Sequence, residues 1–508
     1  MLLRATRRND RPRKAAALVI GLALLAGCDG GTSDRTDGGP IDARRAMPDL
    51  IPPPEANIAA ALNCGGPDAG ALARPDELQR HDLDIDAYPD ALCSDGSAAR
   101  LYFRPFRGEE NRDRWVIHLG GGGVCATPED CAAAWCHCNG PNPCPFAAAT
   151  ARLAVDNMSG RGGDSSRPGA GILRRDLSPP SPFADYNQAI LHYCTADHWV
   201  GSARGVTFRT RHPKTGNPVE YVMHFLGARV LDAAIGTLRQ DRADTLVYKL
   251  GGGAVPMPDL DDADLVVFTG ESAGAVGLIH SIDVLADTLR GYSNKCADTV
   301  CPPDVTVLFD SAAGPELSRL DWRMNPNHED TYDKYIDALA TSPSLQGARR
   351  DASCVGWHRL NRPGTEDLCF DDTHVIRNHI SAHMFVRMGL LDATITDDYS
   401  RQALADPMLG PLSPTIFAQV LQRELTAFPA LRQTAEEGPY VFKPPGVFAP
   451  RCTAHETLLR DADVSGTSIT SGGKAFRLID LLTAWSNGQS PTAILATDPN
   501  GGDTVCVP

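Results

Sequence analysis

The sequence predicts an α/β protein in which a mostly parallel central sheet carries helices on both faces. Short apolar segments rich in β-branched residues alternate with segments of helical periodicity, as in parallel sheets whose strands are joined by helices. The chain has 508 residues, of which 42% are hydrophobic and 22% charged. It is therefore long and apolar enough to bury a large core, and its composition excludes a wholly disordered or fibrous protein.

Five segments are expected to be buried strands, because each is a short apolar run. They are residues 115–119, 189–191, 265–268, 305–309 and 384–391. Helices are expected at 227–239 and 273–290, where apolar residues recur at intervals of three and four. Segments rich in proline and glycine are expected to be long loops or insertions: 139–182, 251–262 and 437–450. With no clear interdomain linker, residues 59–508 are predicted to form one domain.

The amino-terminal segment has the pattern of a secretory signal. A cluster of arginines is followed by an apolar stretch at 15–26, which is too short to span a bilayer stably. Leu25-Ala26-Gly27-Cys28 resembles the bacterial lipobox, so residues 1–28 are predicted to be a signal peptide ending at a lipidated Cys28. The alternative is an ordinary signal peptide that contains a cysteine. The Gly-, Pro- and Asp-rich residues 29–58 are predicted to be a disordered tether, and the protein an exported lipoprotein of the bacterial cell envelope.

The net charge narrows the range of partners. Asp and Glu number 63 and Lys and Arg 48, which gives a formal charge of −15. A nucleic-acid partner is not expected, because such proteins need a basic face that replaces counterions. The same charge opposes a polyanionic substrate, although local charge can override it.

The cysteine count supports export to an oxidising compartment. Removing Cys28 from the fifteen cysteines leaves fourteen, an even number that favours disulfides. Cys125 with Cys131, and Cys296 with Cys301, are near enough to close short loops, whereas the other pairings stay open. A group of cysteines with His137 offers an alternative zinc site, although its spacing matches no paired C-x-x-C pattern: Cys125, Cys131, Cys136, Cys138 and Cys144. Disulfides are preferred, and no metal is predicted.

Residues 270–274 form a G-x-S-x-G motif around Ser272. The motif lies between the predicted strand at 265–268 and the predicted helix that begins at Ala273. A strand, a sharp turn and a helix present a serine on a tight elbow at the positive end of the helix. Ser272 is therefore the candidate nucleophile. The alternative is a glycine-rich turn in which the serine only caps the helix.

A nucleophilic serine needs a base and a carboxylate that orients the base. Asp392 follows the apolar run that ends at Leu391, and His455 is the only histidine beyond it. His455 is thus the base if Asp392 is the acid, in the order Ser, Asp, His. Asp310, which follows the strand at 305–309, is the competing acid, and the residue pattern alone leaves both open. His280 is expected inside the helix after Ser272, pointing away from the turn.

An oxyanion site is expected in the glycine run 120–123, which follows His118 and the first strong strand. Glycines let backbone N–H groups face a substrate without an intervening side chain, and Ala273 offers a further N–H after the nucleophile. The alternative is a flexible glycine-rich loop. A phosphate-binding loop is disfavoured because no Gly-Lys-Ser/Thr follows.

Several blocks of the sequence, in order from about residue 95 to 460, resemble the pectin acetylesterase/Notum family. These blocks are 115–125 with Cys131, 171–173, 193–201, 270–274, 310–311, 385–392 and 448–455. The resemblance implies an α/β-hydrolase-like fold with long disulfide-tied insertions, including a short Cys125–Cys131 bridge. It implies no cofactor.

The resemblance also assigns the site residues. It implies Ser272 as nucleophile, Asp392 rather than Asp310 as acid, and His455 as base. It implies that the oxyanion donors are the backbone N–H groups of Gly122, Gly123 and Ala273.

The expected function is that of a lipid-anchored serine carboxylesterase that removes acetyl or other short acyl groups from a carbohydrate ester. Its partners would be an ester substrate, such as an acylated polysaccharide, and the membrane that holds Cys28. Family members often have an acidic residue at the position of Gly120 and a large aromatic at Gly123, and Glu271 replaces a small or polar residue. These departures predict a reshaped pocket. The alternatives are a deacylase for longer acyl esters and a catalytically inert saccharide-binding lipoprotein.

Overall fold

The computed structural model describes most of the chain from residue 57 onward. The described ranges are 57–65, 67, 74, 76–125, 127–138, 144–147, 153–241, 246–250, 253–296, 301–314, 347–396, 414–433, 444–498 and 500–507. The predicted signal peptide, Cys28 and the tether up to residue 56 lie outside them. Within these ranges, no helix combines the length and the apolar character that a membrane crossing requires.

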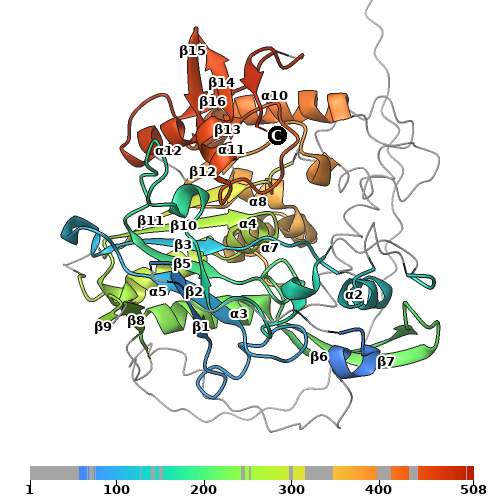
Figure 1. Cartoon of the computed structure of the whole chain (residues 1–508). Helices are drawn as coiled ribbons and strands as arrows, with labels where there is room; N and C mark the ends of the chain where they lie inside the picture. Colours follow the sequence, from blue (N-terminus) through green and yellow to red (C-terminus); the bar gives the residue numbers. More distant parts are fainter. Residues whose placement is uncertain are drawn as a thin grey trace, which may run out of the picture. The chain divides into compact units, whose positions relative to one another are not determined.

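A ten-stranded central sheet organises the fold (Figure 1). Its strands are β1 Leu78–Asp82, β2 Arg100–Arg104, β3 Arg114–Leu119, β4 Ser166–Arg167, β5 Asn187–Leu191, β10 Leu265–Glu271, β11 Asp304–Asp310, β12 His383–Arg387, β13 Gly446–Ala449 and β16 Ala493–Leu495. Their order is β16-β13-β12-β11-β10-β3-β5-β2-β1-β4. Neighbours from β16 to β5 are parallel, and β2, β1 and β4 extend the sheet with antiparallel pairs. The predicted mostly parallel sheet is confirmed.

Helices cover both faces of this sheet because successive strand residues point to opposite sides. In β10, Val266 and Phe268 join one apolar core, while Val267 joins the other. The first core contains apolar side chains of several helices, among them α3 Gly227–Leu238, α4 Ala273–Ile279, α5 Ile282–Tyr292 and α10 Pro414–Gln433. The second core contains those of α12 Leu478–Ser486. A parallel sheet buried on both faces is the expected result of such near-continuous apolar strands.

The remaining helices, 3₁₀ turns and small sheets do not belong to the ten-stranded sheet. The other helices are α1 Ile58–Leu62, α2 Pro128–Trp135, α7 Ala352–Asn361, α8 Asp372–Asn378 and α11 Asp461–Gly466. The 3₁₀ turns are η1 Glu109–Asn111, η2 Val155–Met158, η3 Gly171–Leu173, η4 Leu260–Asp262 and η7 Glu366–Phe370. The small sheets are β6 Ala203–Arg211 with β7 Pro218–Phe225, β8 Val247–Leu250 with β9 Gly253–Pro256, and β14 Ser468–Ser471 with β15 Lys474–Arg477 and β17 Thr504–Val505.

Two predicted elements differ in the structure. The helix expected at 273–290 is two helices, α4 and α5, because Ser281 leaves the helical conformation with φ −129°. His280 therefore caps the end of α4 rather than lying inside a helix, and its Nε2 lies 2.9 Å from Asp372 Oδ1. The strand expected at 384–391 ends at Arg387. Beyond Arg387, the N–H of Leu391 bonds to the carbonyl of Cys452. This hydrogen bond brings the chain next to the segment that contains residue 455.

The proline- and glycine-rich segments also contain regular structure that their composition conceals. The segment 437–450 includes β13, and 251–262 includes β9 and η4. At Gly446 the ring of Phe385 comes so close that an added Cβ would lie 2.2 Å from it, so this glycine belongs to tight strand packing rather than to a loop.

All fourteen cysteines after Cys28 form disulfides. The pairs are Cys64–Cys136, Cys93–Cys194, Cys125–Cys131, Cys138–Cys144, Cys296–Cys301, Cys354–Cys369 and Cys452–Cys506. The two short loops expected from sequence are both present. The alternative zinc site around His137 is wrong, because its five cysteines have no thiolate to offer.

Candidate active site

Ser272 occupies the sharp turn between β10 and α4. Its backbone has φ 48° and ψ −118°, a strained conformation for a non-glycine residue and typical of a nucleophile elbow. The flanking glycines allow this turn. A Cβ on Gly270 would lie 2.6 Å from the backbone of Gly274, and a Cβ on Gly274 would lie 2.1 Å from the carbonyl oxygen of Leu119. The motif glycines are therefore required by close backbone contacts.

His455 and Asp392 meet although 63 residues separate them. His455 Nδ1 lies 2.8 Å from Asp392 Oδ2, and the carboxyl group is fully buried. The other oxygen of Asp392 accepts hydrogen bonds from the N–H groups of Thr394 (3.0 Å) and Ile395 (3.1 Å), which fix the orientation of the side chain. A carboxylate at Nδ1 keeps the proton on that nitrogen and leaves Nε2 as the basic atom.

Asp310, the competing acid, holds the loop that carries His455. Its Oδ2 accepts hydrogen bonds from the N–H groups of Thr457 (2.6 Å) and Leu458 (3.2 Å). Its Oδ1 pairs with the buried guanidinium of Arg387 at 3.0 Å. The carboxylate oxygens of Asp310 are thus engaged by this loop and by Arg387, and the residue that contacts the His455 ring is Asp392, not Asp310.

The same network connects the loop of His455 to the turn of Ser272. Arg387 donates a hydrogen bond to the carbonyl of Ala454 (3.2 Å), next to His455, and the N–H of Ser272 bonds to the carbonyl of Asp310 (2.9 Å). Within the described ranges, the Ser272 hydroxyl makes no hydrogen bond to His455. Catalytic hydrogen bonds of this kind are often long without substrate and tighten in the complex.

The pKa of His455 is raised above its ordinary value. Burial alone lowers this pKa, but the hydrogen bond and charge of Asp392 outweigh it, with further contributions from the charges of Glu456 and Asp310. The site therefore favours the imidazolium that a general base becomes after it takes a proton.

Residues 120–123, which follow β3 and are called the glycine loop below, direct their carbonyl groups toward neighbouring side chains. Trp199 Nε1 donates to the carbonyl of Gly120 (2.9 Å) and Asn157 Nδ2 to that of Gly121 (3.2 Å). The hydroxyl of Tyr193 donates to the carbonyl of Gly123 (2.7 Å).

The N–H groups of the predicted oxyanion donors remain available. In the part of the chain that the structure describes, the N–H groups of Gly122, Gly123 and Ala273 have no protein acceptor. Gly122 and Gly123 have φ 151° and 79°, and a Cβ on Gly122 would lie 1.5 Å from Asn157 Nδ2. Glycine is therefore needed at position 122 both for its backbone angle and for space.

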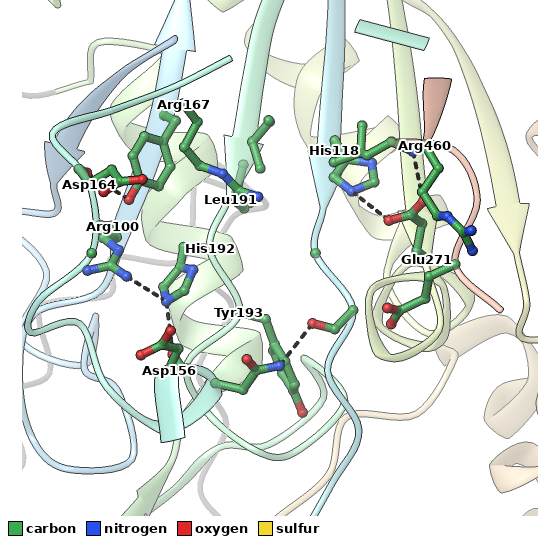
Figure 2. A pocket seen from close by; sticks show the side chains of 18 residues that line it. Arg100, His118, Asp156, Asp164, Arg167, Leu191, His192, Tyr193, Glu271 and Arg460 are labelled. Atoms are coloured by element: carbon green, nitrogen blue, oxygen red, sulfur yellow. Dashed lines mark hydrogen bonds and ion pairs between the residues drawn. The ribbon is translucent and has the colours of Figure 1, made fainter. Parts of the chain in front are cut away.

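A cavity of about 480 Å³ lies beside the glycine loop (Figure 2). We call it the polar cavity, because charged and polar side chains from several segments dominate its lining: Arg100, Arg167, Arg460, His118, His192, Asp156, Asp164, Glu271 and Glu456. Gly120 and Gly121 also line it, so it borders the predicted oxyanion site.

Glu271 and His118 are buried and uncharged in this cavity near neutral pH. Burial, reinforced by the negative charges of Asp310 and Glu456, raises the pKa of Glu271 to about 8. Burial lowers the pKa of His118 to about 3. Glu271 Oε1 accepts a hydrogen bond from the N–H of Leu459 (3.0 Å), and its Oε2 lies 3.6 Å from His118 Nε2. Glu271, unusual in the motif, thus connects β10 to the loop after His455.

Sequence reasoning missed three contributors to this site. Arg387 lies in a strand segment that looked purely apolar, and the positioning role of Asp310 depends on contacts 147 residues away. Asn157 lies in the proline- and glycine-rich segment 139–182, which is expected only to be a long loop or insertion. The one available signal was Arg387 itself. An arginine within an apolar strand is expected to be buried, and a buried charge needs a partner.

Comparison with known proteins identifies the family of this chain. The model of the family described as pectinacetylesterase matches residues 79–496. Human palmitoleoyl-protein carboxylesterase NOTUM is 26% identical over 386 residues, which cover 74% of this chain and 62% of the relative, so the chain spans less than two thirds of that protein. Pectin acetylesterase 4 from Arabidopsis thaliana is 24% identical over 265 residues, covering 52% of this chain and 49% of that protein.

A solved structure supports the fold. The Wnt deacylase Notum from Drosophila superposes with a TM-score of 0.54 at 18% sequence identity, covering 83% of this chain and 97% of that one. The predicted α/β-hydrolase-like fold and the predicted family resemblance are both confirmed. From the extent of the family match, which includes Ser272, Asp392 and His455, the chain belongs to the pectinacetylesterase family.

Proposed function

We propose that this protein is a serine carboxylic ester hydrolase that uses Ser272, His455 and Asp392. The observation that carries the proposal is the 2.8 Å contact between His455 Nδ1 and the buried carboxylate of Asp392, at the sheet edge where Ser272 occupies a strained turn. Family membership supports an esterase or deacylase.

The proposed reaction has two acyl-transfer steps. His455 Nε2 takes the Ser272 proton as the hydroxyl oxygen attacks the ester carbonyl, and the N–H groups of Gly122, Gly123 and Ala273 receive the negative charge on the former carbonyl oxygen. His455 returns the proton to the departing alcohol, which leaves an acyl-serine. Water then attacks the acyl group with His455 again as base, which restores the serine and releases the acid. One such oxyanion donor contributes about 3 kcal/mol.

Replacing the nucleophile tests this proposal. Ser272→Ala should lower kcat for p-nitrophenyl acetate by about 10³-fold or more, with unchanged circular dichroism. Ser471→Ala, on the exposed hairpin of β14, is the matched control and should retain full activity. An Ser272→Ala protein that folds and keeps full activity would exclude Ser272 as the nucleophile.

We further propose a short acyl group and a polar, carbohydrate-like alcohol. The polar cavity beside the glycine loop supports this choice, because arginine and carboxylate side chains are a poor lining for a long aliphatic chain. A series of p-nitrophenyl esters from acetate to palmitate should show kcat/KM falling beyond butyrate, and acetylated polysaccharides should release acetate. A rate that rises with chain length would instead favour a long-acyl deacylase, the activity in the names of the NOTUM relatives.

We propose in addition that the protein is exported and anchored by lipid at Cys28, which lies outside the described residues. Seven disulfides support an oxidising compartment. Cells fed an alkyne-labelled fatty acid should label the protein, and Cys28→Ser should abolish both the label and membrane retention. Equal labelling of the two proteins would contradict the assignment.

A further inference from the structure

Three buried histidines lie together outside the active site. His358 is on α7, His374 is on α8 and His379 caps the end of α8. Their residue exposures are 0%, 5% and 0%. The proposed ester hydrolysis uses none of them. We call these three residues the histidine cluster.

The rings of the histidine cluster converge on one point. Candidate ligand atoms of the three side chains all lie within 4.8 Å of one another. The Nε2 atoms of His358 and His374 are 3.0 Å apart, and the three pairs of ring centroids are separated by 5.1, 5.7 and 5.3 Å. The sulfur of Cys354 is also near, but its disulfide with Cys369 removes it as a thiolate ligand.

The contacts of His358 determine which of its nitrogens can bind a metal. The hydroxyl of Thr365 donates its only proton to the carbonyl of Arg362 (2.7 Å). The 2.7 Å contact between Thr365 Oγ1 and His358 Nδ1 is therefore a bond that the ring nitrogen donates. The acceptor nitrogen of His358 is therefore Nε2, which contacts Nε2 of His374 at 3.0 Å. A ring fixed by an acceptor on its outer nitrogen is typical of metal-binding histidines.

His374 is the second nitrogen of the site. Its Nε2 donates across the 3.0 Å gap to His358 Nε2. Its Nδ1 lies 3.2 Å from Asn378 Nδ2. Metal binding through Nε2 moves the His374 proton to Nδ1. The Asn378 amide then has to rotate so that its Oδ1 accepts this proton, which gives up the 3.0 Å hydrogen bond from its Nδ2 to the carbonyl of His374.

We propose that the histidine cluster binds one divalent transition metal ion of the Zn²⁺ type, with a water molecule or a small anion as the fourth ligand. Imidazole suits zinc and its neighbours, whereas Mg²⁺ and Ca²⁺ require oxygen ligands. Tetrahedral zinc at about 2.0–2.1 Å from nitrogen places ligand nitrogens about 3.4 Å apart, so small rotations of the rings suffice.

The metal would stabilise the helices behind the nucleophile. The His280–Asp372 contact joins α8 to the end of α4, the helix that follows Ser272. Asp371 caps α8 through the N–H groups of Thr373 and His374. A ligand that binds only the folded protein raises its stability by mass action. The metal therefore has a structural role, and its removal should lower thermal stability before it affects ester hydrolysis.

The test uses the tag-free protein with its disulfides intact, after dialysis against a chelator. Addition of Co²⁺ should produce visible ligand-field absorption that saturates at one equivalent, and addition of Zn²⁺ should abolish this absorption and raise Tm. His358→Gln and His374→Gln should lose the absorption and the Tm increase. His137→Gln, at an exposed position outside the cluster, should keep both.

A milder variant covers the case in which the glutamine variants do not fold. Thr365→Val keeps all three histidines but removes the hydroxyl that orients His358, so Co²⁺ affinity should fall about 10- to 100-fold. The proposal is overturned if the wild-type protein gives neither absorption nor a Tm increase. It is equally overturned if folded His358→Gln or His374→Gln gives the wild-type absorption, or if Thr365→Val binds Co²⁺ as tightly as the wild type.

Discussion

The segments on the two sides of Ser272 are held in place by different kinds of contact. On the side of β3 and β5, uncharged contacts fix a glycine loop: Trp199, Asn157 and Tyr193 bind its carbonyl groups. On the side of β11 and β12, buried charges fix the loop of His455 through the Asp310–Arg387 ion pair.

This difference follows from the chemistry that each side would perform. Backbone N–H groups stabilise an oxyanion without any change in their own charge, so they need only correct placement. A base gains and loses a proton in every cycle, so its surroundings must tolerate a charged imidazole. Removing a charge that pairs directly with His455 or within the Asp310–Arg387 ion pair should therefore cost more than a change on the glycine side.

The largest effect is expected from Asp392→Asn. The amide cannot hold His455 in the tautomer that leaves Nε2 basic, so kcat for p-nitrophenyl acetate should fall by about 10⁴-fold. Asp287→Asn, whose side chain is 86% exposed, is the control and should leave kcat unchanged. A loss of less than tenfold would show that Asp392 is not the orienting acid.

The next effect concerns stability. Arg387→Met leaves the buried carboxylate of Asp310 without its partner and should lower the free energy of unfolding by about 3–5 kcal/mol, measured by urea titration. The double variant Asp310→Asn/Arg387→Met removes both charges and should recover part of this loss. Simple additivity of the two single changes would mean that the ion pair does not couple β11 to β12.

On the glycine side, Gly122→Ala should lower kcat about 10²- to 10³-fold with a smaller change in KM, because the added Cβ would collide with Asn157 and displace the N–H donors. Gly253→Ala meets no atom within 4 Å and is the control. A wild-type kcat in Gly122→Ala would remove position 122 from the oxyanion site.

Glu271 should make stability depend on pH. Its carboxyl keeps its proton in the folded protein up to a pKa of about 8, whereas the unfolded chain loses it near 4.5. Stability is therefore fully present below about pH 4.5 and falls as pH rises to 8, by at most about 1.4 kcal/mol per pH unit. Glu271→Gln should match the wild type at pH 4.5 and exceed it in urea midpoint at pH 8. Parallel pH profiles of the two proteins would contradict the raised pKa.

The smallest effect is expected from Glu456→Gln. Its negative charge helps to raise the pKa of His455, so its removal should lower that pKa. Because the base acts when neutral, the rising limb of the kcat/KM profile should move to lower pH by a fraction of a unit. Glu220→Gln, on the separate β6–β7 hairpin, should not move it. A shift to higher pH in Glu456→Gln would reverse the electrostatic account.

The elbow and the parallel strands could be predicted because local sequence determines them. The run 265–268 and the motif at 270–274 are strand and turn signals that need no distant contact. Asp392 could be placed beside His455 only through the family resemblance, since their meeting depends on the path of the chain after Arg387 along residues 450–452. The sequence likewise gave no indication of the histidine cluster, because His358 reaches His374 only when α7 packs against α8.

The measurement that tests the central claim most directly is active-site labelling. The native protein treated with a fluorophosphonate at neutral pH should gain one adduct, which peptide mass spectrometry assigns to Ser272. Asp392→Asn should react far more slowly and unfolded protein not at all. An adduct on any other residue, or undiminished ester hydrolysis by native protein without an adduct, would contradict the account.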